Sequence, residues 1–191
     1  MNQDILVDKE PINVFDKLME QRVIFITDFV TDKDATEIVQ KLIMFGLESD
    51  KKITMFINSP GIQIRAMFMI YDMMALMKCD IEIVATGMCE GGILLLVASG
   101  AKGCRTATKH TFFQMSALGH EGEQAIMSMP EIEIEHRMFK SDNLRFIIAL
   151  SEATGKTEKE IKKLLSQKKT LTVAKAIEVG LIDRAIKAVK A

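Results

Sequence analysis

The stretch Ile53-Thr54-Met55-Phe56-Ile57-Asn58-Ser59-Pro60-Gly61 joins a run of β-branched and apolar residues to a Ser-Pro-Gly turn. Residues 53–57 are typical of a buried strand, and we expect this strand to end at Ser59 because proline and glycine interrupt regular pairing. After the turn, residues 63–77 carry apolar side chains at helical spacing. This part of the chain therefore predicts a strand that leads directly into a helix.

The same pattern of strand and helix lies on both sides of this stretch. Residues 23–27 predict an earlier strand, and Thr31 predicts the N-cap of a helix that begins near Lys33. Residues 81–86 predict a third strand, and an apolar helix over 91–99 follows it. Parallel strands need such crossover helices, so the sequence predicts an α/β fold around a parallel sheet. Because the strands are apolar on both sides, we expect helices to cover both faces of the sheet.

The second half of the chain contains short strand segments and one long helix. Strand-like pieces are predicted near Arg105 and over residues 111–114. A long helix is predicted over about 131–153, because proline and acidic residues suit its first turn. Two shorter helices are expected to begin near Thr157 and Thr172.

Charge, apolar runs and cysteine spacing narrow the class of protein. The formal net charge of -1 gives no reason to expect nucleic acid or an anionic membrane as a partner. The longest apolar run, residues 93–98, is too short to cross a bilayer. The 3 cysteines have no short spacing, which argues against a disulfide framework and a zinc site. We therefore expect a cytoplasmic protein without cofactor or metal, with a single domain over 22–191 after an N-terminal segment, 1–21.

Three stretches of the chain resemble the ClpP family, the proteolytic ring subunits of the Clp system. They are the Ile57-Asn58-Ser59-Pro60-Gly61 turn, Ala101-Lys102-Gly103 followed by Arg105, and Gly180-Leu181-Ile182-Asp183. The resemblance implies a ClpP/crotonase-type spiral of β-β-α units, with the helix over about 131–153 as a handle between two seven-membered rings of a tetradecamer. It also implies homo- or hetero-oligomeric ClpP-like rings, with an AAA+ unfoldase and an active ClpP paralogue as partners.

The positions that resemble the catalytic triad of this family carry the wrong side chains. ClpP-like proteins place the nucleophilic serine in a turn before an apolar helix, and here that turn reads Gly87-Met88-Cys89-Glu90-Gly91-Gly92, with Gly91 at the serine position. The histidine position falls on Met115 or Ser116, depending on one gap, and the aspartate position falls on Lys168. Glycine cannot attack a carbonyl, methionine and serine are not bases, and lysine reverses the charge. The resemblance therefore predicts an inactive, ClpR-like pseudoenzyme with a structural or regulatory role in a Clp protease assembly.

The loop that resembles the family's oxyanion loop is also altered. The resemblance places its positions at Gly61, Ile62 and Gly92, and Ile62 replaces a glycine. We expect this β-branched side chain to crowd the place of a substrate. Glu90 is interpreted as a cap of the following helix or, alternatively, as a group that fills the old active site.

A docking pocket for an AAA+ unfoldase is implied by the same resemblance. Its positions are Leu42, Thr54, Phe56, Leu76, Val84, Thr106 and Thr108. Three of these are threonines where the family has larger apolar groups, and each fully buried apolar side chain contributes about 1.5–3 kcal/mol. We therefore expect weakened docking.

Several alternatives remain open on the sequence alone. Cys89 could be the unconventional nucleophile of an active ATP-dependent Clp endopeptidase, although a buried apolar role is typical of such a cysteine. A crotonase-like acyl-CoA enzyme is a second alternative because that family shares the spiral fold, and a homomeric ring that acts alone as a scaffold or decoy is a third. His110, His120 and His136 are interpreted as exposed or interface residues rather than as bases.

Overall fold

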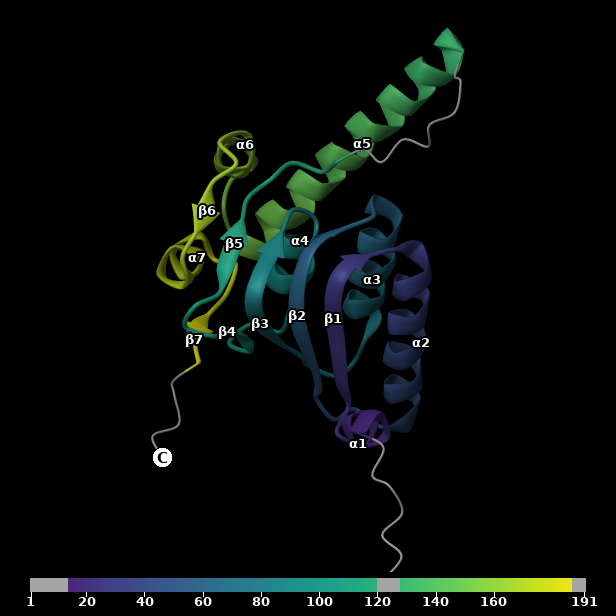
Figure 1. Cartoon of the computed structure of the whole chain (residues 1–191), viewed down its shortest axis with the longest axis vertical. Coiled ribbons are helices and arrows are strands. Elements are labelled where there is room, and N and C mark those ends of the chain that lie inside the picture. The colour runs from purple at the N-terminus through teal and green to yellow at the C-terminus, as the bar shows by residue number, and fades with distance from the viewer. Residues whose placement is uncertain (1–13, 120–127, 187–191) are drawn as a thin grey trace, which may run out of the picture.

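The computed structural model describes residues 14–119 and 128–186, and the elements within these ranges form a mixed α/β fold (Figure 1). In chain order the elements are α1 (Val14–Glu20), β1 (Val23–Val30), α2 (Asp32–Glu48), β2 (Ile53–Ile62), α3 (Ile64–Leu76), β3 (Ile81–Glu90), α4 (Ile93–Ala98), β4 (Arg105–Ala107), β5 (Phe112–Gln114), α5 (Met129–Thr154), α6 (Glu158–Ser166), β6 (Thr170–Leu171), α7 (Val173–Val179) and β7 (Arg184–Ala185).

The sheet is largely parallel, with the strand order β1-β2-β3-β4-β7. It forks at β3, because the first half of β3 pairs with β4 and the second half pairs with β5. The short strand β6 then pairs with β5 in the antiparallel direction. This fork brings the end of β3, the strand β5 and the segment between α6 and α7 together at one place.

The expectation that the second strand ends at Ser59 is wrong. Strand β2 continues through the Ser-Pro-Gly segment to Ile62, and its pairing with β1 shifts by one residue beside Asp28. Asp28 adopts a φ of 57°, and its carbonyl oxygen accepts a hydrogen bond of 2.5 Å from the Ser59 hydroxyl. A β-bulge of this kind accommodates Pro60, which has no N–H to donate to a neighbouring strand. The strand therefore bends here instead of ending.

Within residues 14–119 and 128–186, helices cover only one face of β1 and β2, so the expectation of a sheet covered on both faces is wrong for these two strands. On the covered face, alternate residues of β2, Ile53, Met55 and Ile57, are fully buried. Figure 1 shows α2 and α3 on that side, with no helix over the opposite face of β1 and β2. On the opposite face the ring of Phe25 stacks on Phe56 at 5.1 Å, and Phe25 remains 49% exposed.

A buried ion pair joins the ends of three helices to the sheet. The Arg105 Nη1 group donates to the carbonyl oxygens of Ala98, Ala153 and Gly180 at 2.9, 3.2 and 2.9 Å. Its Nη2 group donates to Asp183 Oδ1 at 2.5 Å. The side-chain hydrogen bonds from Arg105 hold the pKa of Asp183 below its ordinary value. These hydrogen bonds of Arg105 and Asp183, the Arg105 clamp, hold the C-terminal ends of α4, α5 and α7 in place.

The predicted long helix is confirmed as α5, which begins two residues earlier and ends one residue later than expected. Ser128 and Glu131 form a capping box at its start. Its buried residues, Phe146, Ile147, Ala149 and Leu150, all lie in the second half, and the first half projects beyond the sheet (Figure 1). None of the helices in the described ranges has an apolar stretch sufficient to span a bilayer.

Candidate functional site

The candidate site lies at the turn between β3 and α4. Gly91 adopts a φ of +59°, and its N–H donates to the carbonyl oxygen of Gln114 in β5 at 3.2 Å. A Cβ atom built on Gly91 would lie 3.3 Å from Ser116 Oγ and would make no closer contact. A side chain at position 91 would therefore point at the side chain of Ser116.

Of the two residues proposed for the histidine position, the structure places Ser116 against Gly91. Met115 is fully buried in the core, because neighbouring residues along an extended chain point in opposite directions. The Ser116 hydroxyl instead donates to Glu90 Oε1 at 3.3 Å. No side chain caps α4, whose N-cap residue is Gly92, so Glu90 contacts the site rather than the helix.

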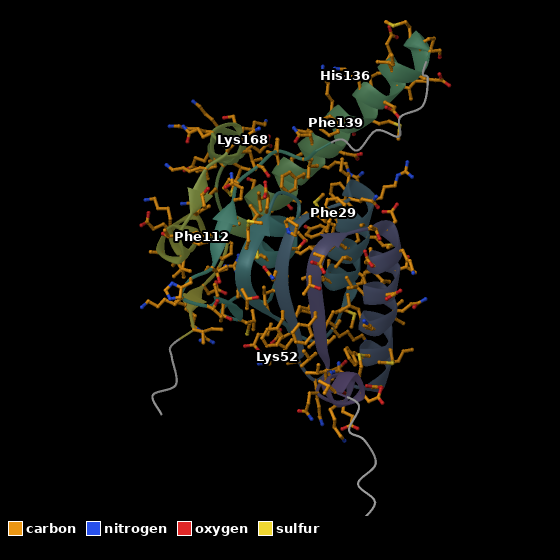
Figure 2. All side chains as sticks on the ribbon, in the orientation of Figure 1. Phe29, Lys52, Phe112, His136, Phe139 and Lys168 are labelled. Carbon is orange, nitrogen blue, oxygen red and sulfur yellow. The ribbon has the colours of Figure 1, made fainter. Side chains whose placement is uncertain are left out.

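The third segment of the candidate site is the chain at Lys168, which follows α6 and lies beside β5. The Lys168 carbonyl oxygen accepts a hydrogen bond of 2.7 Å from Gln114 Nε2, and the Met115 N–H donates to the Lys169 carbonyl oxygen at 2.9 Å. The lysine side chain is exposed, and Figure 2 shows it at the turn between α6 and β6. The fold therefore brings positions 91, 116 and 168 into one neighbourhood.

Gln114 is the residue of this site that the sequence analysis missed. Its backbone carbonyl receives the Gly91 N–H, its side-chain amide donates to Lys168, and Thr170 Oγ1 donates to its Oε1. The available signal was strand alternation, since Gln114 and Ser116 are two residues apart and share one side of an extended chain.

The family comparison agrees with this arrangement of elements. The model of the Clp protease family matches residues 7–189 of the chain.

The chain belongs to the Clp protease family.

Similar proteins from two genera carry the same family name. The chain is 35% identical over 176 residues to the ATP-dependent Clp protease proteolytic subunit 1 of Corynebacterium efficiens, which covers 90% of this chain and 82% of the relative. It is 33% identical over 176 residues to the proteolytic subunit 2 of Mycobacterium leprae, covering 90% of this chain and 80% of that relative. These matches support a Clp-type subunit whose resemblance extends over most of each chain.

Apolar groups line the loop that the resemblance places at the oxyanion position. Ile62 is buried, and a Cβ atom built on Gly92 would lie 2.8 Å from its Cγ2 atom and 2.8 Å from Met67 Sδ. A Cβ atom on Gly61 would lie 3.0 Å from the ring of Phe29. The Ile62 side chain therefore packs on the Cβ side of Gly92, in the space that a side chain at position 92 would need.

Cys89 is poorly suited to nucleophilic chemistry. Its side chain is fully buried, and its Sγ atom donates to the Ile57 carbonyl oxygen at 3.6 Å. Burial raises the pKa of this thiol to about 12, so the reactive thiolate is scarce at neutral pH. His110 and His136 are exposed and far along the chain from it, and His120 lies outside the described residues.

The residues proposed for the docking pocket do not form one pocket in a single chain. Leu42 cannot line a surface pocket, because it belongs to the buried face of α2 and is fully buried. Thr106 is also buried, and its hydroxyl donates to the Ile83 carbonyl oxygen at 3.0 Å. Leu76 is 76% exposed at the end of α3, on the helical side of the sheet, whereas Thr54 and Phe56 lie on the opposite face. Of the remaining two residues, Val84 lies on β3. Thr108 lies just after the neighbouring strand β4.

The described residues were searched for clustered metal ligands. No group of three or more histidine, cysteine, aspartate or glutamate side chains there could hold a metal ion. The expectation of no cofactor stays a prediction.

Proposed function

We propose that this chain is a non-hydrolytic subunit of a Clp-type ring, with a structural or regulatory role. The observation that carries the proposal is the convergence of Gly91, Ser116 and Lys168 in one site. At the three positions that resemble the triad, the chain offers a hydrogen atom, a hydroxyl and an exposed ammonium group instead of a hydroxyl, an imidazole and a carboxylate, which supports the proposal. Loss of such a relay removes a rate factor on the order of a million.

The remaining polar pair in the site does not substitute for that relay. The Ser116 hydroxyl donates to Glu90 Oε1 at 3.3 Å, but this pair contains no imidazole that could pass a proton from a nucleophile to the leaving group. Ile62 also places an apolar side chain against the Cβ side of Gly92, beside the turn that resembles the family's oxyanion loop. Both observations favour a site that is closed to peptide hydrolysis.

The assembly around this subunit follows from its relatives. The similar proteins are named as proteolytic subunits of ATP-dependent Clp proteases, so we propose a cytoplasmic ring in which this chain accompanies an active paralogue and an AAA+ unfoldase. In such a ring it would dilute active sites or determine how the two rings pair through α5. The match to the Clp protease family over residues 7–189 favours this assembly over a crotonase-like acyl-CoA enzyme.

A peptide-hydrolysis assay tests the proposal. We expect the purified chain to hydrolyse a fluorogenic peptide no faster than buffer, while a triad-containing Clp subunit prepared in the same way shows full turnover. We also expect iodoacetamide and a Cys89→Ala substitution to change nothing, because Cys89 is buried and protonated. Turnover that disappears in Cys89→Ala would replace this proposal by a cysteine peptidase. Turnover insensitive to Cys89 would show another nucleophile and would also refute it.

A further inference from the structure

A buried arginine and a buried cysteine meet at the end of the sheet where β1 begins. Arg22 lies between α1 and β1, has a φ of 57° and is 7% exposed. Cys79 lies in the turn between α3 and β3 and is also 7% exposed. The Arg22 Nη2 group donates a long hydrogen bond of 4.0 Å to Cys79 Sγ. A permanent cation therefore lies beside a thiol inside the protein.

The hydrogen bonds of the Arg22 guanidinium group leave one of its edges incomplete. Nη1 donates to the Phe45 carbonyl oxygen at 2.7 Å and Nη2 donates to the Ser49 carbonyl oxygen at 3.0 Å, both at the C-terminal end of α2. Within residues 14–119 and 128–186, the buried Nε group has no hydrogen-bond partner. A buried donor without an acceptor is costly in free energy. Nε and Nη2 form one edge of the planar group, so the unused N–H lies next to the nitrogen that contacts Cys79.

The positive charge of Arg22 is only weakly balanced. Among the described residues its ion-pair partner is Glu48, whose Oε2 atom lies 3.7 Å from Nη1 and whose side chain is 58% exposed. The Phe45 ring lies 5.0 Å from the guanidinium carbon and adds a cation–π contact. A buried cation with a distant and solvated partner favours a further anion beside it. Glu48 approaches Nη1, so the edge formed by Nε and Nη2 is the place for that anion.

We propose that Cys79 is a site of oxidation by hydrogen peroxide, and that the Nε edge of Arg22 binds the oxygen of the sulfenate that forms. The sulfur attacks one peroxide oxygen and the O–O bond breaks. The departing hydroxide and the thiol proton form water, so the sulfur loses the two electrons that the peroxide gains. The sulfenic acid then releases its proton to water.

The geometry of the pair fits an oxygen atom on the sulfur. An oxygen bonded to Sγ on the side of Arg22 lies nearer to Nη2 than Sγ does, so the contact of 4.0 Å becomes a charge-assisted hydrogen bond of about 2.7–2.9 Å. The same oxygen accepts from Nε, which otherwise has no partner among the described residues. Oxidation thus supplies both the missing acceptor and the missing negative charge.

The turn that carries Cys79 gives peroxide a route to the sulfur. Lys78 and Asp80, its neighbours in the chain, are both exposed. Surface turns open locally more readily than strands of the core. Cys89 is the contrast, because it lies within β3, is fully buried and donates to the Ile57 carbonyl oxygen. The two buried cysteines therefore differ in access and in their hydrogen-bond partner.

Trapping of the sulfenate tests this site. The full chain carrying Cys104→Ser, which removes the partly exposed cysteine, is treated with hydrogen peroxide. Catalase removes the excess, and dimedone is added together with denaturant so that a buried sulfenate also reacts. In peptide mass spectrometry we expect the dimedone adduct on Cys79 and not on Cys89, and we expect a thiol reductant added before dimedone to abolish it. Arg22→Gln lowers the labelled fraction about tenfold, as for one lost hydrogen bond to a charged group.

Glu48→Gln replaces Arg22→Gln if circular dichroism shows the latter to be unfolded. Removing this exposed carboxylate leaves the guanidinium less compensated, so the labelled fraction of Cys79 rises about twofold. Glu178→Gln, at an exposed position in α7, is the matched control and leaves the fraction unchanged. An unlabelled Cys79 overturns the site, as does equal labelling of Cys79 and Cys89.

The role of Arg22 is overturned if folded Arg22→Gln leaves the labelling unchanged or, where that variant is unfolded, if Glu48→Gln does so. Because modification rather than hydrolysis is measured, either result leaves the proposal of an inactive subunit standing.

Discussion

Replacing Arg105 with methionine lowers the free energy of unfolding by about 3–5 kcal/mol, the range found when one partner of a buried ion pair is removed. The Arg105 side chain is 4% exposed, and its loss leaves Asp183 without its cation and three helix-terminal carbonyl oxygens without this donor. Urea unfolding at one fixed protein concentration measures the change.

Lys102→Met is the matched control for this substitution. Lys102 Nζ also donates to the Ala153 carbonyl oxygen, at 2.5 Å, but its side chain is exposed. We expect a change below about 1 kcal/mol, as for other exposed charged groups. Equal effects of the two substitutions would contradict the role given to burial and to the branched hydrogen bonding of the guanidinium group.

The Arg105 clamp also predicts how the free energy of unfolding depends on pH. The pKa of Asp183 is lowered from 3.8 in the folded chain, chiefly by its side-chain hydrogen bonds from Arg105. Its contribution is therefore complete above about pH 4 and disappears as the pH falls through the lower folded pKa. We expect Asp183→Asn to reduce stability at pH 7 and to make the unfolding free energy less dependent on pH below 4.

Peptide hydrolysis appears when Gly91→Ser, Ser116→His and Lys168→Asp are combined. The Cβ direction at position 91 points at Ser116, so an introduced hydroxyl and an introduced imidazole face each other. Lys168 has a φ of 46°, a conformation that aspartate tolerates better than most residues. General-base catalysis contributes about 10²–10⁴-fold, and we expect a gain in this range over the unmodified chain in a fluorogenic-peptide assay.

The matched control is the same combination with Gly91→Ala in place of Gly91→Ser. Both substitutions impose the same strain of about 1–2 kcal/mol at the φ of +59°, but alanine has no nucleophile. Equal rates for the two combinations would mean that the site does not place these groups as proposed. Adding Ile62→Gly to the serine combination increases the rate further, because the Ile62 methyl group near Gly92 is removed.

Local patterns in the sequence predicted most of the elements. Thr31 is the N-cap of α2 and α6 begins directly after Thr157, as expected, because a capping side chain bonds to its own helix. Both threonines also form capping boxes, which were not predicted. The end of β2 was predicted wrongly, because the Ser59 hydroxyl and the bulge at Asp28 compensate for Pro60 across two strands. Proline and glycine are visible in the local sequence. The contact that compensates for them, from the Ser59 hydroxyl to the Asp28 carbonyl oxygen, joins residues 31 positions apart and is not visible there.

By itself, the sequence determined the α/β order of elements, the long helix and the identity of the side chains at positions 91, 116 and 168. These properties depend on periodicity, caps and residue chemistry, which are local. Only the tertiary structure decided that Ser116 rather than Met115 faces Gly91, that Ile62 packs on the Cβ side of Gly92, and that no described helix covers one face of β1 and β2. Each of these features depends on side-chain direction and on packing between segments distant in sequence. Many tertiary arrangements are compatible with the same local pattern, so the pattern alone does not select among them.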